Sequence, residues 1–320
     1  MTDAPHRPLL ITHGGKFHLD EVFAYAVLRL ALSFFCPGKD HALIRTRRPE
    51  LIEAGDIVFD VGGIFDVTAN RFDHHQIGAP TRADGTPYSS AGLVWQIYGA
   101  RAVAALLAPE AAQFVPLITA KLDEKLVKRI DEIDNGVSMS GAVIRDPLGL
   151  AALVEDFNPP WDSPDANGPT AGDDAFHHAA AMVCGVLTRQ VEIQRAKLRA
   201  EALVLAAHEA SGDKRLLVLE SGMPWKNVVF SYDLPVLFTV SPASNGNWMV
   251  DTVPPEPGSF AQRLSLPERW AGLQGAELAA ASGVEDAVFV HVRRFVGGAK
   301  TREGAIAMAH LALAEAAPGT

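Results

Sequence analysis

A short apolar run that leads through a glycine turn into a long apolar helix is the feature that most constrains how this chain folds. Residues 8–12 (PLLIT) have the length and content of a buried strand, and residues 20–35 show the pattern of a helix. Residues 43–46 and 56–61 are two further candidate strands. This alternation predicts an α/β domain whose sheet is rich in parallel strands and flanked by helices. Ligands of such sheets bind at the carboxyl ends of the strands.

Length, composition and charge limit the class of protein. The chain has 320 residues, of which 48% are hydrophobic, so it can bury a large core. This length suggests two domains, and one large domain is the alternative. The formal net charge of -10 argues against a broad electrostatic grip on nucleic acid, but it leaves room for a local basic groove.

The two cysteines and the hydropathy of the chain bear on its location. Cys36 and Cys184 lie in apolar runs without a pairing pattern, and we predict that both are buried free thiols in a reducing compartment. Residues 1–8 are polar, and no apolar run reaches membrane-spanning length. We therefore expect a cytoplasmic protein with no membrane contact, and a homo-oligomer stays open.

The loop after the first predicted strand carries the first candidate ligands. His13, His18 and Asp20 lie between the strand and the helix, where an α/β sheet places its ligands. The alternative is that Asp20 and Glu21 only stabilise the helix N-terminus. That alternative explains the two acids well and the two histidines poorly.

Two later segments carry similar residues. Asp60 lies inside the apolar strand predicted at 56–61, just before a glycine turn, and a carboxylate there is costly unless it is hydrogen-bonded, paired or metal-bound. Asp73, His74 and His75 are consecutive, and neutral imidazoles bind divalent metals well. The alternative for such a histidine pair is an ordinary surface or capped position.

Acidic residues also end a predicted helix at 111–133. Negative side chains near a helix C-terminus oppose the macrodipole, so Asp131, Glu132 and Asp134 require a cation nearby. Lys128 and Arg129 can supply part of that charge, and we predict a metal ion for Asp134 only. Before this helix, residues 77–88 are predicted to form a loop, and Ser89 and Ser90 are predicted to cap a helix at 91–107.

The second half of the chain has a different pattern of predicted helices and strands. A loop at 158–172 precedes a long predicted helix at 173–211, in which His177 and His178 are interpreted as structural or exposed. Strands without intervening long helices follow, which indicates a smaller α+β domain. These strands are predicted at 215–219, 235–240, 248–253 and 287–291. The predicted division is a catalytic domain at 1–175, a connecting helix at 176–211 and a substrate-binding domain at 212–320.

A glycine-rich segment near the C-terminus is a candidate phosphate cradle. Gly297 and Gly298 allow close backbone approach, and Thr301 can cap a helix whose N-terminus suits an anion. Lys300 and Arg302 add positive charge, as does Arg293 in the preceding segment. The alternative is a plain glycine turn before a capped helix.

Taken in order, these segments resemble the DHH phosphoesterase superfamily, and more closely its melanocyte-proliferating-gene-type exonuclease family. The resemblance covers nearly the whole chain. The matching segments are THGGKFHLDE at 12–21, DIVFDVGG at 56–63, RFDHHQ at 71–76, SSAGLVW at 89–95, EIDNG at 132–136, PWK at 224–226, SFAQRLSLPERW at 259–270 and GGAKTREGA at 297–305.

The resemblance implies a DHH-type metal-binding domain and two divalent metal ions, with Mn²⁺ expected and Mg²⁺ or another transition metal as alternatives. The implied metal ligands are His13, His18, Asp20, Asp60, His74 and Asp134. Asp60 resembles the bridging carboxylate, and His75 resembles the residue that faces the substrate phosphate. The implied catalytic residues are Asp20, Asp60, His74 and His75.

Two positions depart from the family pattern. Many DHH enzymes have a carboxylate where this chain has His18, which makes the site less negative and leaves the metal identity open. The C-terminal loop of the family usually has a histidine where this chain has Ala299. We expect Lys300 to take over anion binding from that histidine, and the alternative is a loop that binds anions more weakly.

The residue types predict phosphodiester hydrolysis. Two divalent ions can activate water and stabilise the attacking and leaving oxygens, so no side-chain nucleophile is required. Neither a Gly-x-Ser-x-Gly elbow nor a P-loop lysine motif is found. We expect an exonuclease acting on single-stranded RNA or a short oligonucleotide. The alternatives are a phosphohydrolase for a dinucleotide or pyrophosphate and a metal-bound regulatory protein without turnover.

Overall fold

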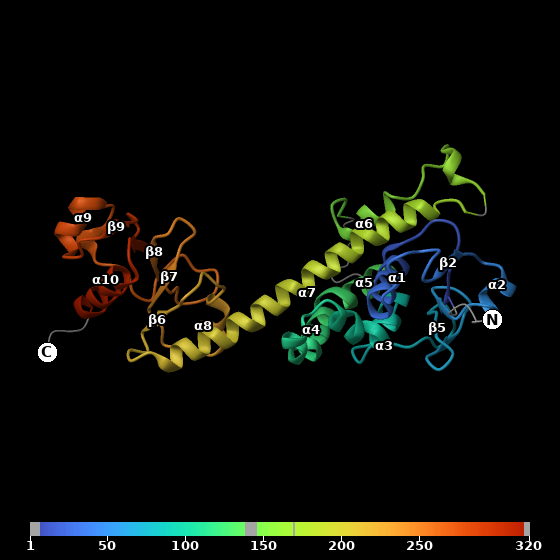
Figure 1. The fold of residues 1–320 in the computed structure, drawn as a ribbon, viewed down its shortest axis with the longest axis horizontal. Helices are drawn as coiled ribbons and strands as arrows, with labels where there is room; N and C mark the ends of the chain where they lie inside the picture. The colour runs from blue at the N-terminus through green and yellow to red at the C-terminus, as the bar shows by residue number, and fades with distance from the viewer. Residues whose placement is uncertain (1–6, 138–145, 169, 317–320) are drawn as a thin grey trace, which may run out of the picture. The chain divides into compact units, whose positions relative to one another are not determined.

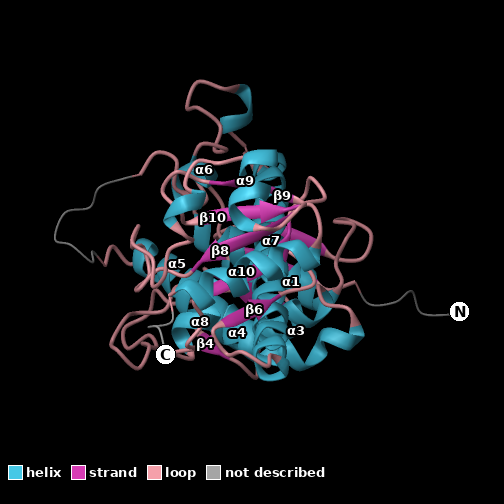
Figure 2. Cartoon of the chain, turned by 90° about the vertical axis from the view of Figure 1, so that its left-hand side faces the viewer, coloured by secondary structure: helices cyan, strands magenta, loops and turns pink. Residues whose placement is uncertain are grey.

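The chain forms two compact units, Met1–Arg195 and Ala196–Thr320, which are described separately (Figure 1). The computed structural model describes residues 7–137, 146–168 and 170–316. Each unit contains one five-stranded sheet together with helices (Figure 2). The first sheet is rich in parallel strands and the second is mixed, which confirms the predicted α/β class.

The first sheet has the strand order β2-β1-β3-β5-β4. Its strands are β1 (Leu9–Thr12), β2 (Ala42–Arg45), β3 (Ile57–Phe59), β4 (Phe65–Asp66) and β5 (Arg71–Phe72). All neighbouring strands are parallel except β4 and β5. Because β2 and β3 lie on opposite sides of β1, the strand order reverses there, and a ligand site is expected at the carboxyl ends.

Three neighbouring parallel strands end directly before candidate ligands. His13 follows β1, Asp60 follows β3 and Asp73 follows β5. Since parallel strands end at the same edge of a sheet, this topology brings together residues that are about 60 positions apart in the sequence. The strand arrangement therefore brings these three segments of the predicted site together.

The helices of the first unit are α1 (Leu19–Leu32), α2 (Pro49–Glu53), α3 (Ser90–Ala105), α4 (Val115–Leu122), α5 (Lys128–Asp134) and α6 (Leu150–Glu155). α1 packs against α3, with the rings of Phe23 and Trp95 6.0 Å apart. The predicted single helix at 111–133 is wrong in detail. A 3-10 helix (Pro109–Phe114) and a π-helical turn (Asp123–Val127) interrupt it, and π-turns of this kind are short insertions within α-helices.

A buried carboxylate fastens α5 to the start of α3. Asp131 Oδ1 accepts hydrogen bonds from Ser89 Oγ at 2.6 Å and from the backbone N–H groups of Ser89 and Gly92. Arg82 Nε donates to Asp131 Oδ2 at 2.7 Å. Ser90 Oγ donates to Asp20 Oδ2 at 2.8 Å. The two serine hydroxyls therefore bind acids from other helices, which corrects their predicted role as side-chain caps of α3.

The long helix α7 (Asp173–Ala210) begins on the first unit and contains the division between the units. The Phe176 ring packs at 5.4 Å from Phe17, and the His177 ring lies 5.8 Å from Tyr25. His178 is exposed, so the structural or exposed interpretation of this histidine pair is confirmed. The domain boundaries at 175 and 211 stay a prediction.

The cysteines differ from their prediction. Cys36 is exposed and Cys184 is only half-buried. Cys36 follows the end of α1, which stops where Ser33 adopts the left-handed conformation, with φ 58°. A short apolar run placed just beyond a helix end need not be buried. No helix in the described ranges, α7 included, is long and apolar enough to cross a membrane.

The second sheet has the order β6-β7-β8-β10-β9, and the core of this unit includes Phe238, Trp270 and Met308. Its elements are β6 (Leu216–Val218), α8 (Lys226–Ser231), β7 (Phe238–Pro242), β8 (Trp248–Thr252), α9 (Gly275–Ser282), β9 (Ala287–Val290), β10 (Val296–Ala299) and α10 (Arg302–Glu315). The four predicted strands are confirmed within a few residues, and α10 packs against the sheet.

Strand β10 corrects the predicted glycine turn. Gly297 and Gly298 are buried and pair with β8 on one side and β9 on the other. A Cβ atom on Gly298 would lie 2.9 Å from the carbonyl oxygen of Trp248. The glycines are therefore required by close strand packing, and the sheet rather than a ligand occupies their backbone.

We predict that Asp131→Ala destabilises the first unit by about 1–3 kcal/mol, because the buried Ser89 hydroxyl and the N–H groups of Ser89 and Gly92 lose their acceptor, whereas Arg82 keeps its pair with Asp123. Urea denaturation followed by circular dichroism measures the free energy of unfolding. Asp84→Ala is the matched control, since Asp84 pairs with Lys128 at the surface, and it should have little effect. Equal stability of the two variants would contradict the role given to Asp131.

For the second unit, we predict that Gly298→Ala lowers the free energy of unfolding by about 1–3 kcal/mol, as expected for overpacking between strands. Gly212→Ala is the control, because an added Cβ there meets no atom within 4 Å. Thermal melting of both variants provides the measurement. If the Gly298→Ala protein had the same melting temperature as the wild type, β10 would tolerate a side chain at this position.

Candidate metal centre

Eight histidine, aspartate and glutamate residues gather at the carboxyl edge of the first sheet. They form four overlapping groups of three, and within each group the candidate ligand atoms lie within 4.8 Å of one another. The members are His13, His18, Asp20, Glu21, Asp60, His74, His75 and Asp134. All six residues predicted as metal ligands are in this set, together with Glu21 and His75.

Asp60 lies at the centre of the cluster. Its Oδ2 is 3.2 Å from His13 Nε2, and its Oδ1 is 3.3 Å from His74 Nε2. The residue lies just beyond β3 and has φ 57°, a left-handed conformation that is unusual for a non-glycine residue. Such backbone strain is often found at functional sites, and here it turns the carboxylate toward residues from β1 and β5.

Glu21 joins the site although the sequence indicated only a helix-terminal role. Its Oε1 accepts the backbone N–H of His18 at 2.9 Å, as in a capping box, and lies 2.8 Å from His13 Nε2. The side chain is completely buried. The acid-rich helix start was the only signal in the sequence, and it is equally well explained by capping.

The aspartate of the Asp-His-His segment positions its two histidines. Asp73 is buried, and its Oδ1 accepts the backbone N–H of His74 at 2.8 Å and lies 2.7 Å from His75 Nδ1. Its Oδ2 accepts the N–H of Gly63. His74 Nε2 reaches inward to within 3.4 Å of Asp134 Oδ2, while the His75 side chain is 63% exposed. The pair therefore presents one inner and one outer imidazole.

Several buried polar atoms of the cluster have no hydrogen bond of good geometry. They are Asp20 Oδ1, Glu21 Oε2, Asp60 Oδ1 and His74 Nε2. Asp60 Oδ1 and His74 Nε2 are close enough for an ion pair, at 3.3 Å, but do not form a hydrogen bond. Buried polar groups are normally satisfied, so four unsatisfied atoms in one cluster indicate a missing partner. Carboxylate oxygens and imidazole nitrogens are the donor set that divalent transition metals bind, and these residues therefore fit metal ions.

Imidazoles offset part of the negative charge. Burial opposes a charged imidazole, but Asp60 and Glu21 beside it raise the pKa of His13 to about 10. Burial also opposes ionisation of Asp60, yet the neighbouring His13 and His74 lower its pKa to about 2. In the same way, nearby carboxylates overcome burial and raise the pKa of His74 to about 9.

The remaining acids resist ionisation. Burial and the charge of Asp20 raise the pKa of Asp134 to about 8. Burial and the charge of Asp60 raise the pKa of Asp20, and burial with the charge of Asp20 raises that of Glu21. The positive charge of two histidines is thus too small to neutralise four carboxylates. A bound cation would neutralise the remaining negative charge.

The three acidic residues at the end of α5 contact different partners. Asp131 pairs with Arg82 and Glu132 with Arg129, so both have protein cations, although Arg82 comes from the preceding loop rather than from α5. Asp134 turns into the cluster of candidate metal ligands, and its binding of a metal ion stays a prediction. This difference follows from the helical rotation of about 100° per residue, which points neighbouring side chains in different directions.

A cavity of about 410 Å³ opens onto the cluster. Its lining includes His13, His18, Asp60, His74, His75 and Asp134, with Arg47 and Asn135. Arg47 Nη2 lies 3.2 Å from His13 Nδ1. Arg47 follows β2 and thus reaches the same edge of the sheet.

The predicted phosphate-binding residues lie in the second unit. The Thr301 side chain accepts the N–H of Gly304, which confirms Thr301 as the N-cap of α10. Asp286 Oδ2 accepts the N–H of Thr301 at 2.8 Å, so a carboxylate already lies at this helix start. Arg302 pairs with Glu220 at 2.8 Å, whereas the side chains of Lys300 and Arg293 are exposed.

Comparisons with known proteins identify the family of this chain. The MYG1 exonuclease family model, described as an uncharacterised protein family (UPF0160), matches residues 9–313. The chain is 35% identical to a human protein named MYG1 exonuclease, over 96% of this chain and 86% of that protein. It is also 35% identical to a MYG1 protein of Caenorhabditis elegans, over 95% of each chain.

A more distant relative extends the match, and a MYG1 protein of Dictyostelium discoideum is 31% identical over 94% of each chain. No solved structure gives a significant match. The family match spans both units and includes all eight residues of the cluster. The chain belongs to the MYG1 exonuclease family.

Proposed function

We propose that this protein is a divalent-metal-dependent phosphodiester hydrolase that removes nucleotides from an end of single-stranded RNA or short oligonucleotides. The observation that carries the proposal is the buried ligand cluster with its four unsatisfied atoms at the strand ends. The names of the relatives support it, since the human protein is named an exonuclease.

His13, His18, Asp20, Asp60, His74 and Asp134 would hold two metal ions. His13 and His18 lie in the β1–α1 loop, Asp20 lies in the first turn of α1, and Asp134 ends α5. Ions bound there supply a metal-activated water and charge stabilisation for the leaving oxygen. We expect Mn²⁺, with Mg²⁺ or another transition metal as alternatives, because the site mixes imidazoles with carboxylates.

The remaining residues orient the site and the substrate. Asp73 fixes the ring of His75, which stands exposed at the cavity and can donate a hydrogen bond to a substrate phosphate. Ser90 holds one oxygen of Asp20 and leaves the other for a ligand role. Glu21 and Asp60 hold His13 from one side of its ring, which limits its rotation.

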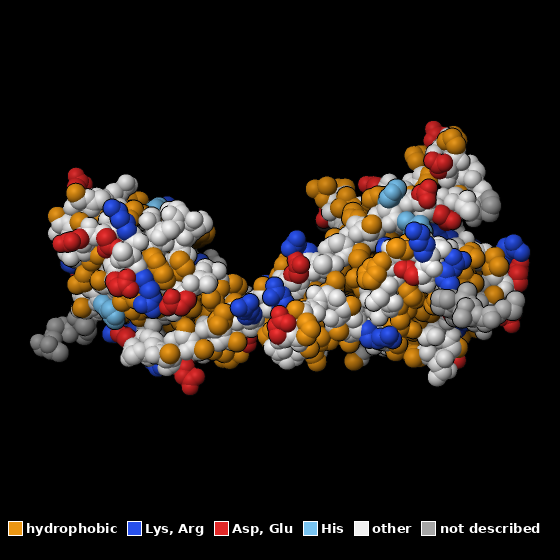
Figure 3. Space-filling view, in the orientation of Figure 1, with side chains coloured by type: hydrophobic (Ala, Val, Ile, Leu, Met, Phe, Trp, Pro, Cys, Tyr) orange, Lys and Arg blue, Asp and Glu red, His pale blue; other side chains and the backbone are white. Residues whose placement is uncertain are grey.

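A small-substrate phosphohydrolase is the second candidate. The net charge of -10 favours it, and Figure 3 shows acidic and basic side chains scattered among one another on the face in view. An RNA ladder separates the two candidates. Stepwise shortening of long strands supports the exonuclease, whereas cleavage of dinucleotides or pyrophosphate alone supports the small-substrate enzyme.

We predict that Asp60→Asn abolishes hydrolysis, with a loss of at least about 100-fold, and weakens metal binding. Asparagine tolerates the left-handed backbone of this position, so the fold should survive. Activity with added Mn²⁺, metal content and circular dichroism are measured together. Asp66→Asn, at an exposed position of β4, is the control and should retain activity. A folded Asp60→Asn protein with normal turnover would refute the assignment.

A second prediction concerns substrate binding by the C-terminal unit. We predict that Lys300→Ala weakens oligonucleotide binding and reduces the slope of log affinity against log salt by about 0.7, as for one lost phosphate contact on a single strand. Arg302→Ala should have a smaller effect, because Glu220 already neutralises that charge. Gly297 and Gly298 are expected to act through β10, which presents Lys300.

Fluorescence anisotropy of a labelled oligonucleotide at several salt concentrations measures both quantities. Cleavage of a small phosphodiester should be unchanged in both variants. Equal losses on polymer and small substrate would place Lys300 in the catalytic step, and no loss on either would remove this segment from substrate binding.

A further inference from the structure

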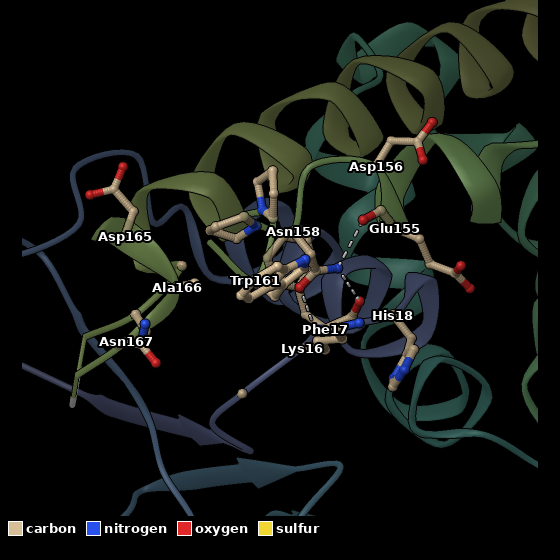
Figure 4. Close-up of a pocket in the computed structure, with 15 residues that line it drawn as sticks. Lys16, Phe17, His18, Glu155, Asp156, Asn158, Trp161, Asp165, Ala166 and Asn167 are labelled. Carbon is tan, nitrogen blue, oxygen red and sulfur yellow. Dashed lines mark hydrogen bonds between the residues drawn. The ribbon is translucent and has the colours of Figure 1, made fainter. Parts of the chain in front are cut away.

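A second, larger cavity of about 700 Å³ adjoins the metal centre. Its volume lies within the range of small-molecule binding pockets. His18 lines this cavity and also the smaller cavity around Asp60, so the two spaces meet at one ligand side chain. Figure 4 shows His18 on one side of this cavity, Asn158 and Trp161 beside it, and residues 165–167 farther away.

An exposed indole stands in the wall of this cavity. The Trp161 side chain is 88% exposed, whereas Trp95, Trp225 and Trp270 are buried. Among the described residues, no other aromatic ring packs against Trp161. Large exposed aromatic side chains next to a cavity are typical of binding sites, because their flat apolar surface is covered when a ligand stacks on it.

The segment that carries Trp161 is fastened to the metal-binding loop. Phe17 N–H donates to Asn158 Oδ1 at 2.9 Å, and Asn158 Nδ2 donates to the Phe17 carbonyl at 2.9 Å. Phe17 is completely buried and directly precedes His18. This paired contact fixes the start of the Trp161 segment at a constant distance from the metal centre.

The charges of the cavity wall favour a base over a phosphate. Its carboxylates are Glu155, Asp156 and Asp165, and Lys16 is the lysine in its lining. An excess of negative charge repels a phosphate. It is compatible with a neutral planar ring, and exocyclic amino groups of a nucleobase can donate hydrogen bonds to carboxylates.

We propose that this cavity is a nucleobase subsite, in which a base that flanks the scissile phosphate stacks on Trp161. The proposal rests on the proposed function and adds to it a site for the substrate ring. The metal centre holds the phosphate, and stacking on Trp161 aligns the nucleotide without selecting strongly among bases, since every base has an aromatic face.

The first test compares RNA oligonucleotides that carry an abasic residue at the terminal or the adjacent nucleotide with the intact strand. For the wild type, kcat/KM should fall about tenfold for one of the two abasic strands, as expected for a lost stacking contact. Trp161→Ala should cause the same loss on the intact strand and no further loss on that abasic strand. Trp161→Phe should retain most of the activity.

Phe35→Ala is the matched control, because Phe35 is an exposed aromatic residue of the same unit outside this cavity lining. It should leave all strands unaffected. Equal losses on intact and abasic strands in Trp161→Ala, or no loss on either, would overturn the base subsite.

The second test separates this proposal from the proposed function. Calorimetry measures binding of AMP and of ribose 5-phosphate, which lacks the base, to the wild type and Trp161→Ala. The wild type should bind AMP about tenfold more tightly, and Trp161→Ala should lose that preference. If no strand is cleaved but this preference is present, the exonuclease fails and the base subsite stands. Equal binding of both compounds by the wild type overturns the subsite.

Discussion

The rest of the first unit depends on three buried carboxylates and one partly buried carboxylate at one edge of a parallel sheet. Asp20, Glu21, Asp60 and Asp134 lie close enough to raise one another's cost of ionisation. His13 and His74 offset part of this charge and hold the pKa of Asp60 low. A chain that keeps such a cluster gains little stability from it, and binding of divalent cations is its clearest physical use.

Other buried acids differ from these in how completely they are satisfied. Asp131 accepts hydrogen bonds from Ser89, Gly92 and Arg82, and Asp73 accepts the N–H groups that shape its own turn. By contrast, Asp20 and Asp60 each keep one buried oxygen without a hydrogen bond. Acids whose oxygens are fully hydrogen-bonded therefore have a structural role, whereas acids with a free buried oxygen are candidate ligands.

The acidic character of the chain is compatible with a nucleic-acid substrate when attraction is local. Metal ions would provide the positive charge at the scissile phosphate, so the protein surface need not be broadly basic. Trp161 offers an uncharged contact that adds affinity without opposing the net charge of -10. Stacking and metal coordination would together replace the electrostatic surface that many nucleic-acid-binding proteins use.

The sequence by itself determined the parts of the site that depend on local pattern. The apolar strands near His13 and Asp60 were recognisable because strand content and glycine turns are local signals, whereas the two-residue strand β5 before Asp73 was not predicted. The parallel order of those strands then placed the ligands together. The Asp-His-His segment and the start of α1 needed no tertiary information to be identified as candidates.

Only the tertiary structure decided which partner each of the other residues meets. The sequence predicts Glu21 as a capping residue. In the fold, the oxygen that caps the helix also contacts His13. Gly297 and Gly298 resemble a turn locally, because the pairing of β10 with β8 and β9 involves residues distant in sequence. The hydroxyl of Ser89 binds Asp131, 42 positions away, for the same reason. Such contacts depend on chain topology, which local propensity does not encode.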